Sequence, residues 1–179
     1  MASIEHVLIL KLGREAWNKW RSDNPHEKID LREAVLAGRE LWQYDLHDAD
    51  LSGANLAHSN LSEANLNGAN LEGADLLGAH MYKTQARNAN LKNARLVISR
   101  IVKTDLEGAI LDGCAVYGAS VWNANLLGAS QEDLKITQLK EPIITVDNLE
   151  VAQFIYLLLN SQKLRDAISP DYSYVLVKS

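Results

Sequence analysis

The chain has 179 residues, enough for one domain with a sizeable core, and its formal net charge at pH 7 is −5. This mild acidity argues against direct binding of nucleic acid, which usually requires a clustered basic surface. Only one Phe is present, and the four Trp and six Tyr are scattered along the chain, so Leu and Ala have to build most of the core.

The N-terminal segment is apolar but interrupted by charge. Glu5, His6 and Lys11 lie within its apolar run, so it fits neither a signal peptide nor a membrane span. We therefore expect a cytoplasmic protein with no membrane contact.

Residues 3–21 are instead predicted to form one helix. Ser3 is a suitable N-cap, and residues 22–25, Ser-Asp-Asn-Pro, would end the helix. Apolar residues recur at steps of three and four, which predicts a buried stripe made of Ile4, Val7, Leu8, Leu12, Ala16, Trp17 and Trp20.

Residues 49–80 carry an internal repeat of five residues. They read ADLSG ANLAH SNLSE ANLNG ANLEG ADLLG AH, with Leu at every fifth position. A small residue stands two places before each Leu, and Asp or Asn stands one place before it. A five-residue step turns about 500° on an α-helix and alternates faces on a strand, so neither element could collect the Leu residues on one side. The pattern indicates a chain that turns a corner every five residues and directs each Leu to a shared interior.

This pattern resembles the A(D/N)LXX consensus of the pentapeptide-repeat family. The resemblance implies a right-handed quadrilateral β-helix with four pentapeptides per coil, in which each Leu and the preceding small residue point inward. The register extends from Leu31 to Leu126, which corresponds to about five coils. Arg39 and Tyr44 occupy small positions near its start, so the first coil is expected to be distorted.

The other positions of the repeat suit turns and offer little chemistry. Asn and Asp can accept a hydrogen bond from the backbone two residues on, and Gly frees the backbone at a bend. Cys114 falls at a small position and is expected to be buried and unreactive. His58 and His80 could approach each other on neighbouring coils, but no third metal ligand is evident. We expect no enzyme activity, no metal and no cofactor.

Both ends of a β-helix expose unpaired backbone, so repeat proteins cover their ends with capping elements. We expect residues 1–28 to form an N-terminal helical cap and residues 29–129 to form the repeat domain. Residues 130–179 would form a C-terminal helical cap and tail. The C-terminal helix should begin with Asp147 as its N-cap, because Glu150 follows three places later.

The C-terminal helix is apolar nearly all round from Leu149 to Leu159, so it needs cover on more than one side. One side should close the end of the β-helix near Val121 and Leu126. The rest would be covered either by the tail, in which residues 172–177 could form a strand, or by a second copy of the chain. We expect a homodimer through this helix.

Outward residues 20 apart should stack in columns on the surface. Two neighbouring columns become apolar toward the C-terminal coils, and a contiguous apolar patch usually marks a contact surface. With the C-terminal helix they supply the candidate partner-binding residues, which are Leu77, Tyr82, Val97, Ile98, Val102, Tyr117, Trp122, Phe154, Leu157 and Leu158.

Charge is segregated along the chain. Residues 30–75 hold nine acids and two bases, whereas residues 83–103 hold six bases and no acid. These bases are Lys83, Arg87, Lys92, Arg95, Arg100 and Lys103. They form either an ordinary solvated surface or a basic belt that meets an acidic partner or phosphates.

The sequence therefore favours a non-catalytic interaction or scaffold module that binds a protein partner of unknown identity. The segment from Asp147 to Ile168 also resembles one that follows pentapeptide repeats in longer bacterial chains. The alternative, implied by the family alone, is a DNA-mimic inhibitor of a type II topoisomerase such as gyrase. Residues 83–103 speak against mimicry, because their bases interrupt the acidic surface.

Overall fold

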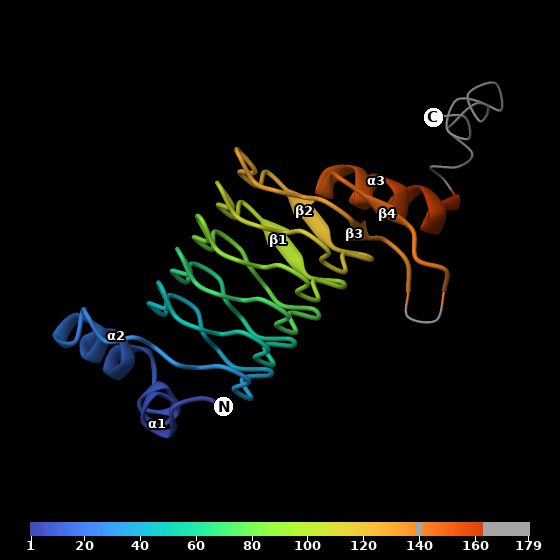
Figure 1. Ribbon diagram of the computed structural model, residues 1–179. Helices are drawn as coiled ribbons and strands as arrows, with labels where there is room; N and C mark the ends of the chain where they lie inside the picture. The colour runs from blue at the N-terminus through green and yellow to red at the C-terminus, as the bar shows by residue number, and fades with distance from the viewer. Residues whose placement is uncertain (139–140, 163–179) are drawn as a thin grey trace.

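A computed structural model describes residues 1–138 and 141–162. Stacked loops make up its centre, with two helices at the N-terminal end and one at the C-terminal end (Figure 1). The elements in chain order are α1 (Ile4–Lys11), α2 (Arg14–Asp23), β1 (Arg100–Val102), β2 (Ser120–Trp122), β3 (Leu134–Lys135), β4 (Thr145–Val146) and α3 (Leu149–Asn160).

The stacked loops are joined by a parallel ladder whose partners lie 20 residues apart. Single bridges run from Asp30↔Asp50 to Ala115↔Lys135, and β1 pairs with β2 at the same spacing. A spacing of 20 residues corresponds to four pentapeptides in each coil, as the family resemblance implied. The ladder continues to Lys135, because the small position at Leu134 is still filled by a buried side chain.

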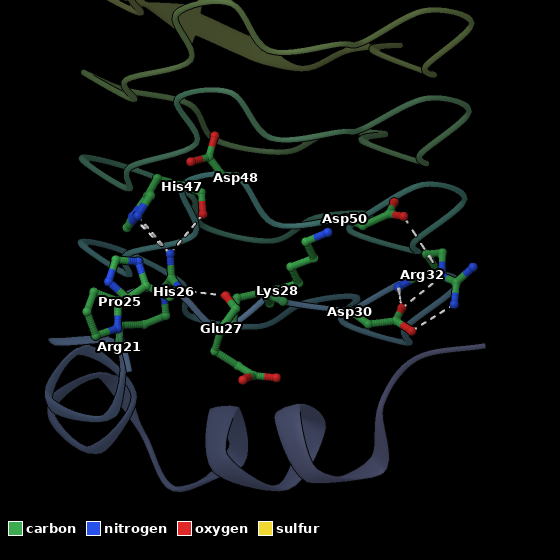
Figure 2. Close-up of a pocket in the computed structure, with 11 residues that line it drawn as sticks. Arg21, Pro25, His26, Glu27, Lys28, Asp30, Arg32, His47, Asp48 and Asp50 are labelled. Atoms are coloured by element: carbon green, nitrogen blue, oxygen red, sulfur yellow. Dashed lines mark hydrogen bonds and ion pairs between the residues drawn. The ribbon is translucent and has the colours of Figure 1, made fainter. Parts of the chain in front are cut away.

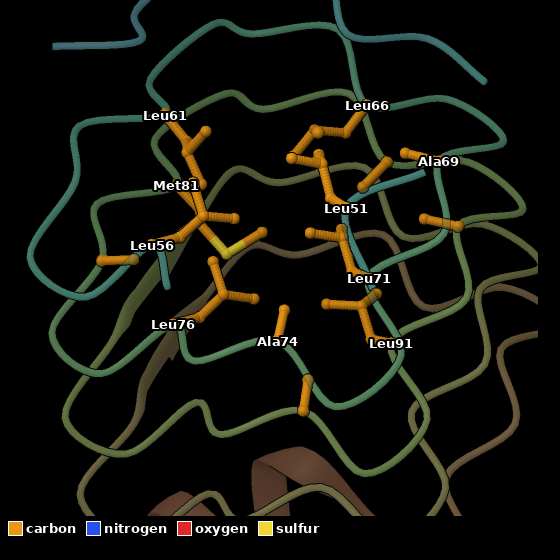
Figure 3. Close-up of a cluster of buried hydrophobic side chains, with 14 of the residues drawn as sticks. Leu51, Leu56, Leu61, Leu66, Ala69, Leu71, Ala74, Leu76, Met81 and Leu91 are labelled. Atoms are coloured by element: carbon orange, nitrogen blue, oxygen red, sulfur yellow. The ribbon is translucent and has the colours of Figure 1, made fainter. Parts of the chain in front are cut away.

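The interior consists mainly of Leu and Ala stacked along the axis, with Met81 among them (Figure 3). Leu51, Leu71 and Leu91 follow one another at the 20-residue step and are fully buried, as are Ala69 and Ala89 at the small positions. The inward placement of these two positions is thus confirmed. Each buried Leu contributes about 1.5–3 kcal/mol of hydrophobic stabilisation.

The corners follow the same five-residue rule. Every fifth residue from Glu33 to Asp133 has a positive φ, between 51° and 70°, whatever its side chain. Before many of the corners an Asn or Asp accepts from the backbone two residues on, as when Ser52 N–H donates to Asp50 Oδ1 at 3.1 Å. Ile98, with a φ of 51°, is the one β-branched residue in this series.

The predicted N-terminal helix is in fact two helices. Ser3 caps α1 as expected, since its side chain accepts from the backbone N–H of His6 at 3.5 Å. The chain then breaks at Gly13, whose φ of 105° is open to glycine but strained for other residues, and α2 begins at Arg14.

The predicted apolar stripe on this segment is wrong for α1. Ile4, Leu8 and Leu12 are exposed, whereas His6 and Leu10 are buried. Because the chain bends at Gly13, the two helices do not share one continuous face, and the steps of three and four counted across the break have no structural meaning.

Both N-terminal helices lie against the first coil. Ser3 N–H donates to the Asp30 carbonyl at 3.0 Å, and Trp17 Nε1 donates to the Asp45 carbonyl at 2.8 Å. Tyr44, at a position that usually holds Ala, is buried and its hydroxyl donates to a backbone carbonyl of α1 at 3.5 Å. Arg39, at another small position, is exposed. The coil nevertheless keeps the regular bridges and corner φ values, so the expected distortion of its backbone is not seen.

At the other end, α3 lies over the last coil. Its N-cap is Asn148, whose side chain accepts from Val151 N–H at 2.9 Å, one residue later than the sequence indicated. Asp147 is unavailable for capping because it accepts from Asp133 N–H. Leu149 and Ala152 are buried against the coil. The strand expected at residues 172–177 lies outside the described residues.

Candidate functional site

The two apolar columns predicted from the sequence form ladders on neighbouring faces. Leu77, Val97 and Tyr117 lie on successive coils, because Gly78 N–H donates to the Val97 carbonyl and Ile98 N–H to the Tyr117 carbonyl, both at 2.9 Å. All three side chains of this first column are half-buried. The first column is therefore a continuous but partly covered strip.

The C-terminal end of the first column is covered by the chain itself. The rings of Tyr117 and Tyr156, from α3, meet edge to face with centroids 5.0 Å apart, and Gln138 Nε2 donates to the Tyr117 hydroxyl at 2.8 Å. Beside them lies a cleft of about 530 Å³, which we call the Tyr117 groove. It is lined by Arg95, Val97, Ile98, Ala115, Tyr117, Lys135, Thr137, Gln138, Glu141 and Ile143.

Ile98 stands at the corner beside this groove. It is 48% exposed and retains a left-handed backbone, which costs an ordinary side chain about 1–2 kcal/mol. Its methyl group lies over Gly118, where an added Cβ would be only 3.0 Å from Ile98 Cγ2 and 3.4 Å from the Tyr156 ring. Gly118 thus makes room for Ile98 and α3 on the same coil.

The second column is the exposed one. Tyr82, Val102 and Trp122 lie on successive coils, since Lys83 N–H donates to the Val102 carbonyl at 2.9 Å and Val102 pairs with Trp122 in the β1–β2 ladder. Tyr82 is 39% exposed and Trp122 is 56% exposed. Their rings therefore face solvent on a strip held by backbone hydrogen bonds.

Basic side chains flank this second column. The row before it holds His80 and Arg100, and the row after it holds Lys83 and Lys103. Lys83 Nζ lies 5.3 Å from the centroid of the Tyr82 ring. We call the surface formed by His80, Tyr82, Lys83, Arg100, Val102, Lys103 and Trp122 the aromatic–basic face.

Ion pairs divide the predicted basic belt in two. Arg87 pairs with Asp105 and Glu107 on the next coil, and Arg95 Nη1 lies 2.9 Å from Asp75 Oδ2 on the preceding one. Lys83, Arg100 and Lys103 form no ion pair with any residue that the structure describes. Of the four belt residues without an ion pair to any described residue, three therefore lie on the aromatic–basic face, and the fourth, Lys92, lies on another face.

The remaining candidate residues lie on α3. Phe154 is 52% exposed, whereas Leu157 and Leu158 are half-buried. The ten predicted residues thus fall into three places: the covered first column with Ile98, the exposed second column, and α3. The sequence missed the part of the groove formed by Thr137 and Gln138, which continuation of the 20-residue register from Tyr117 would have placed there.

A second pocket, of about 500 Å³, lies between α2 and the first coils (Figure 2). Arg21 is buried at its edge and donates from Nη2 to the His47 carbonyl at 2.9 Å and from Nη1 to the Glu27 carbonyl at 3.4 Å. Sequence reasoning missed this pocket, because nothing local relates Arg21 to a residue 26 positions away.

Arg32 pairs with both Asp30 and Asp50 in this pocket. Arg32 donates to Asp30 through two nitrogens, at 2.9 and 2.8 Å, and its Nε lies 3.9 Å from Asp50 Oδ2. The hydrogen bond from Arg32 lowers the pKa of Asp30 to about 2, so this carboxylate stays ionised. The pocket lies where the N-terminal segment meets the coils.

Cys114 has no nucleophilic character in this position. It is fully buried, its Sγ lies 3.0 Å from the Leu91 carbonyl, and burial raises the pKa of the thiol to about 12. Within residues 1–138 and 141–162, no group of three or more His, Cys, Asp or Glu is arranged to hold a metal ion. Within the same residues, no helix is long and apolar enough to cross a membrane.

Comparison with known families identifies the repeats. The family model described as pentapeptide repeats (8 copies) matches residues 29–68 and 59–96. Residues 29–96 are pentapeptide repeats. Pentapeptide-repeat proteins fold as right-handed quadrilateral β-helices, with which the parallel ladder at 20-residue spacing agrees.

Several solved pentapeptide-repeat structures are similar to this chain. A pentapeptide repeat protein from the thylakoid lumen of Arabidopsis thaliana matches with a TM-score of 0.57 and 25% identity, over 73% of this chain and 94% of that one. HetL, involved in the regulation of heterocyst differentiation in Nostoc sp. strain PCC 7120, has a TM-score of 0.45 and 30% identity, over 60% of this chain and 53% of its own. Another from Nostoc PCC 7120 has a TM-score of 0.41 and 28% identity, over 64% and 77%. No curated protein sequence matches the chain.

Proposed function

We propose that this protein is a non-catalytic interaction module that binds another protein through its aromatic–basic face. The observation that carries the proposal is the exposure of Tyr82 and Trp122 on a backbone ladder. Trp and Tyr dominate the binding energy of protein interfaces, and a rigid support reduces the entropy lost when a partner binds. The cluster of unpaired cations around these rings adds specificity for the partner.

The helices at the two ends fit this role as caps on the rod. The N-terminal helices take up backbone groups of the first coil, such as the Asp45 carbonyl, and α3 buries Leu149 on the last coil. Covered ends prevent the edge-to-edge pairing that open coils would invite, so the side faces remain for a specific partner. The proposal includes a cytoplasmic location, on the strength of the charged N-terminal segment.

The test is affinity capture from the source cell with three baits. The double variant Tyr82→Ala/Trp122→Ala should lose a protein that the wild type retains. Trp42→Ala is the matched control, because Trp42 belongs to the same column but lies at the first coil with the Arg14 guanidinium 3.9 Å from its ring. Equal capture by all three baits would remove the aromatic–basic face from the proposal.

Gyrase inhibition by DNA mimicry is the second candidate, and we place it below partner binding. A mimic of DNA needs a continuous acidic surface, whereas Lys83, Arg100 and Lys103 interrupt this one without acidic partners in the described part of the chain. We expect no inhibition of gyrase supercoiling at low micromolar protein. Potent inhibition would reverse the order of the two candidates.

A homodimer through α3 accompanies the proposal. Phe154 and Val151 project from the side of the helix away from its buried residues, at 52% and 45% exposure, and a large apolar side chain gains about 1.5–3 kcal/mol when it is buried. Light scattering should give a dimeric mass, and Phe154→Glu should give a monomer with an unchanged circular-dichroism spectrum. A monomeric wild type at all concentrations would refute the dimer.

A further inference from the structure

The aromatic–basic face has three parallel rows of side chains. In β1 the pattern exposed–buried–half-buried turns Arg100 and Val102 outward on either side of buried Ile101. β2 repeats the arrangement with Ser120 and Trp122, in register with β1. The corner residues form the third row, so the central row of apolar and aromatic groups runs between two polar rows.

The central row leaves space above Val102. Successive coils are ~4.8 Å apart, so the rings of Tyr82 and Trp122 stand about 10 Å from each other along the axis. Between them Val102 is half-buried and much smaller than either ring. One aliphatic or aromatic side chain of a partner can lie on Val102 with a ring on each side.

The outer rows supply charge on both sides of that position. Arg100 lies in one row and Lys83 and Lys103 in the other, and none of the three is paired with an acid in residues 1–138 or 141–162. Alternate side chains of an extended peptide lie on the same side and are roughly 6.8 Å apart, so two acidic side chains can face the surface on either side of a central apolar one. Acidic residues on either side of a central apolar residue would therefore reach both rows.

The cationic area is short along the axis, and this limits its partner. Toward the N-terminus the lysine row is followed by Glu63, which accepts from Gln43 Nε2 at 2.8 Å, and the arginine row leads to Glu40, which accepts from Asn60 Nδ2 at 2.7 Å. Toward the C-terminus the lysine row ends at Asn123. A long polyanion such as nucleic acid would run onto Glu40 and Glu63, whereas a short acidic peptide would not.

We propose that the aromatic–basic face binds a short, extended acidic peptide segment of a partner protein, with one apolar side chain seated on Val102 between Tyr82 and Trp122. This inference rests on the proposed function and names the chemistry of the partner. It gives the unpaired cations and the exposed rings one common ligand.

The probe is a fluorescein-labelled peptide of sequence Glu-Asp-Leu-Asp-Glu with blocked termini, titrated with the full chain and followed by fluorescence anisotropy. We expect saturable binding that weakens as salt is raised, because exposed charges are screened within ~10 Å at 0.1 M salt. The neutral peptide Gln-Asn-Leu-Asn-Gln should bind at least about tenfold more weakly, the effect of losing one charge-assisted contact. Glu-Asp-Gly-Asp-Glu should also lose affinity, because it has no side chain for Val102.

Two charge reversals locate the site. Lys103→Glu should weaken binding of the acidic peptide by at least about tenfold. Lys92→Glu is the matched control, since Lys92 is an equally exposed base on another face, and it should change affinity less than about twofold. An unchanged circular-dichroism spectrum and slow labelling of Cys114 will show that both variants are folded.

Three results would overturn the inference: no saturable binding of the acidic peptide at millimolar concentration, equal effects of Lys103→Glu and Lys92→Glu, or tighter binding of a short thymidine oligonucleotide than of the peptide. If Tyr82→Ala/Trp122→Ala still abolishes capture of a cellular protein, the proposed function stands and only the acidic ligand is wrong. If the peptide binds as expected but Tyr82→Ala/Trp122→Ala captures the same proteins as the wild type, the face binds peptides and the proposed function as an interaction module is wrong.

Discussion

Ser59→Ala should stabilise the protein, although it removes a polar group from a buried site. Ser59 occupies a small inward position and is fully buried, and its Oγ has no hydrogen-bond partner among the described residues. At equivalent positions Ser99 Oγ donates to the Leu96 carbonyl and Thr84 Oγ1 to the Leu61 carbonyl, both at 2.7 Å. Thr104 Oγ1 donates to the Met81 carbonyl in the same way, so these positions hold three satisfied hydroxyls and the unsatisfied one of Ser59.

The magnitude follows from the cost of burying a hydroxyl. A hydroxyl without a partner costs roughly 1–3 kcal/mol in proteins, and Ala has no such group at the position where the repeat usually carries Ala. We expect Ser59→Ala to raise the free energy of unfolding by about 1 kcal/mol. Ser99→Ala should lower it by about 1 kcal/mol, because a satisfied hydrogen bond is lost from an equally buried site.

Thermal unfolding followed by circular dichroism, with urea unfolding beside it, will compare the two variants. For a chain of this size 1 kcal/mol corresponds to roughly 2–4 °C in Tm, so Ser59→Ala should melt above the wild type and Ser99→Ala below it. If Ser59→Ala lowers Tm as much as Ser99→Ala does, then Ser59 is hydrogen-bonded in solution and the reasoning fails.

Three further outcomes are expected. Leu71→Asp should unfold the protein or cost several kcal/mol, because it buries an unpaired carboxylate, whereas Leu127→Asp, at an exposed position, should leave Tm within a few degrees. A thiol reagent should label Cys114 far more slowly in the native protein than in denaturant. Because the pKa of the thiol is raised, its contribution to stability is fully present below the unfolded pKa of about 9 and declines as the pH rises from there toward 12. Because its pKa is lowered to about 2, Asp30 contributes stability above pH 3.8, its unfolded pKa, and this contribution is lost as the pH falls toward 2. Arg32→Ala should return the pKa of Asp30, measured by NMR titration, to near 3.8.

The repeat predicted the solenoid because every coil requires the same residue types at the same positions. Leu at most central positions and Ala at most small ones leave a single way to collect both inside, and this assigned Leu71 and Cys114 to the interior. The ends could not be predicted in the same way. The break at Gly13 and the choice of Asn148 as the cap of α3 depend on the coil against which each segment packs. Asp147 has the right chemistry for a cap but is held by Asp133.

The candidate site was predictable only in its composition. Counting 20 residues forward placed Tyr82, Val102 and Trp122 in one column, and the ladder confirms their alignment. The same count could not reveal which column is covered, because Tyr156 reaches the first column from a helix outside the repeat. Nor could it reveal that Arg87 is neutralised by acids on the following coil.

In this fold the conformation of the backbone does not depend on the outward side chains, so a few of those side chains can define a binding surface. The corner backbone is the same at Gly78, Lys83 and Ile98, so the outward side chains do not determine the coil. A residue that opposes its local conformation, as Ile98 does with a positive φ, needs a reason in what it contacts. Ile98 has one such contact in the Gly118 corner below Tyr156, and its exposed half adjoins the Tyr117 groove. In such a solenoid, a corner residue that suits a positive φ less well than Asn or Gly does is a good guide to a binding face.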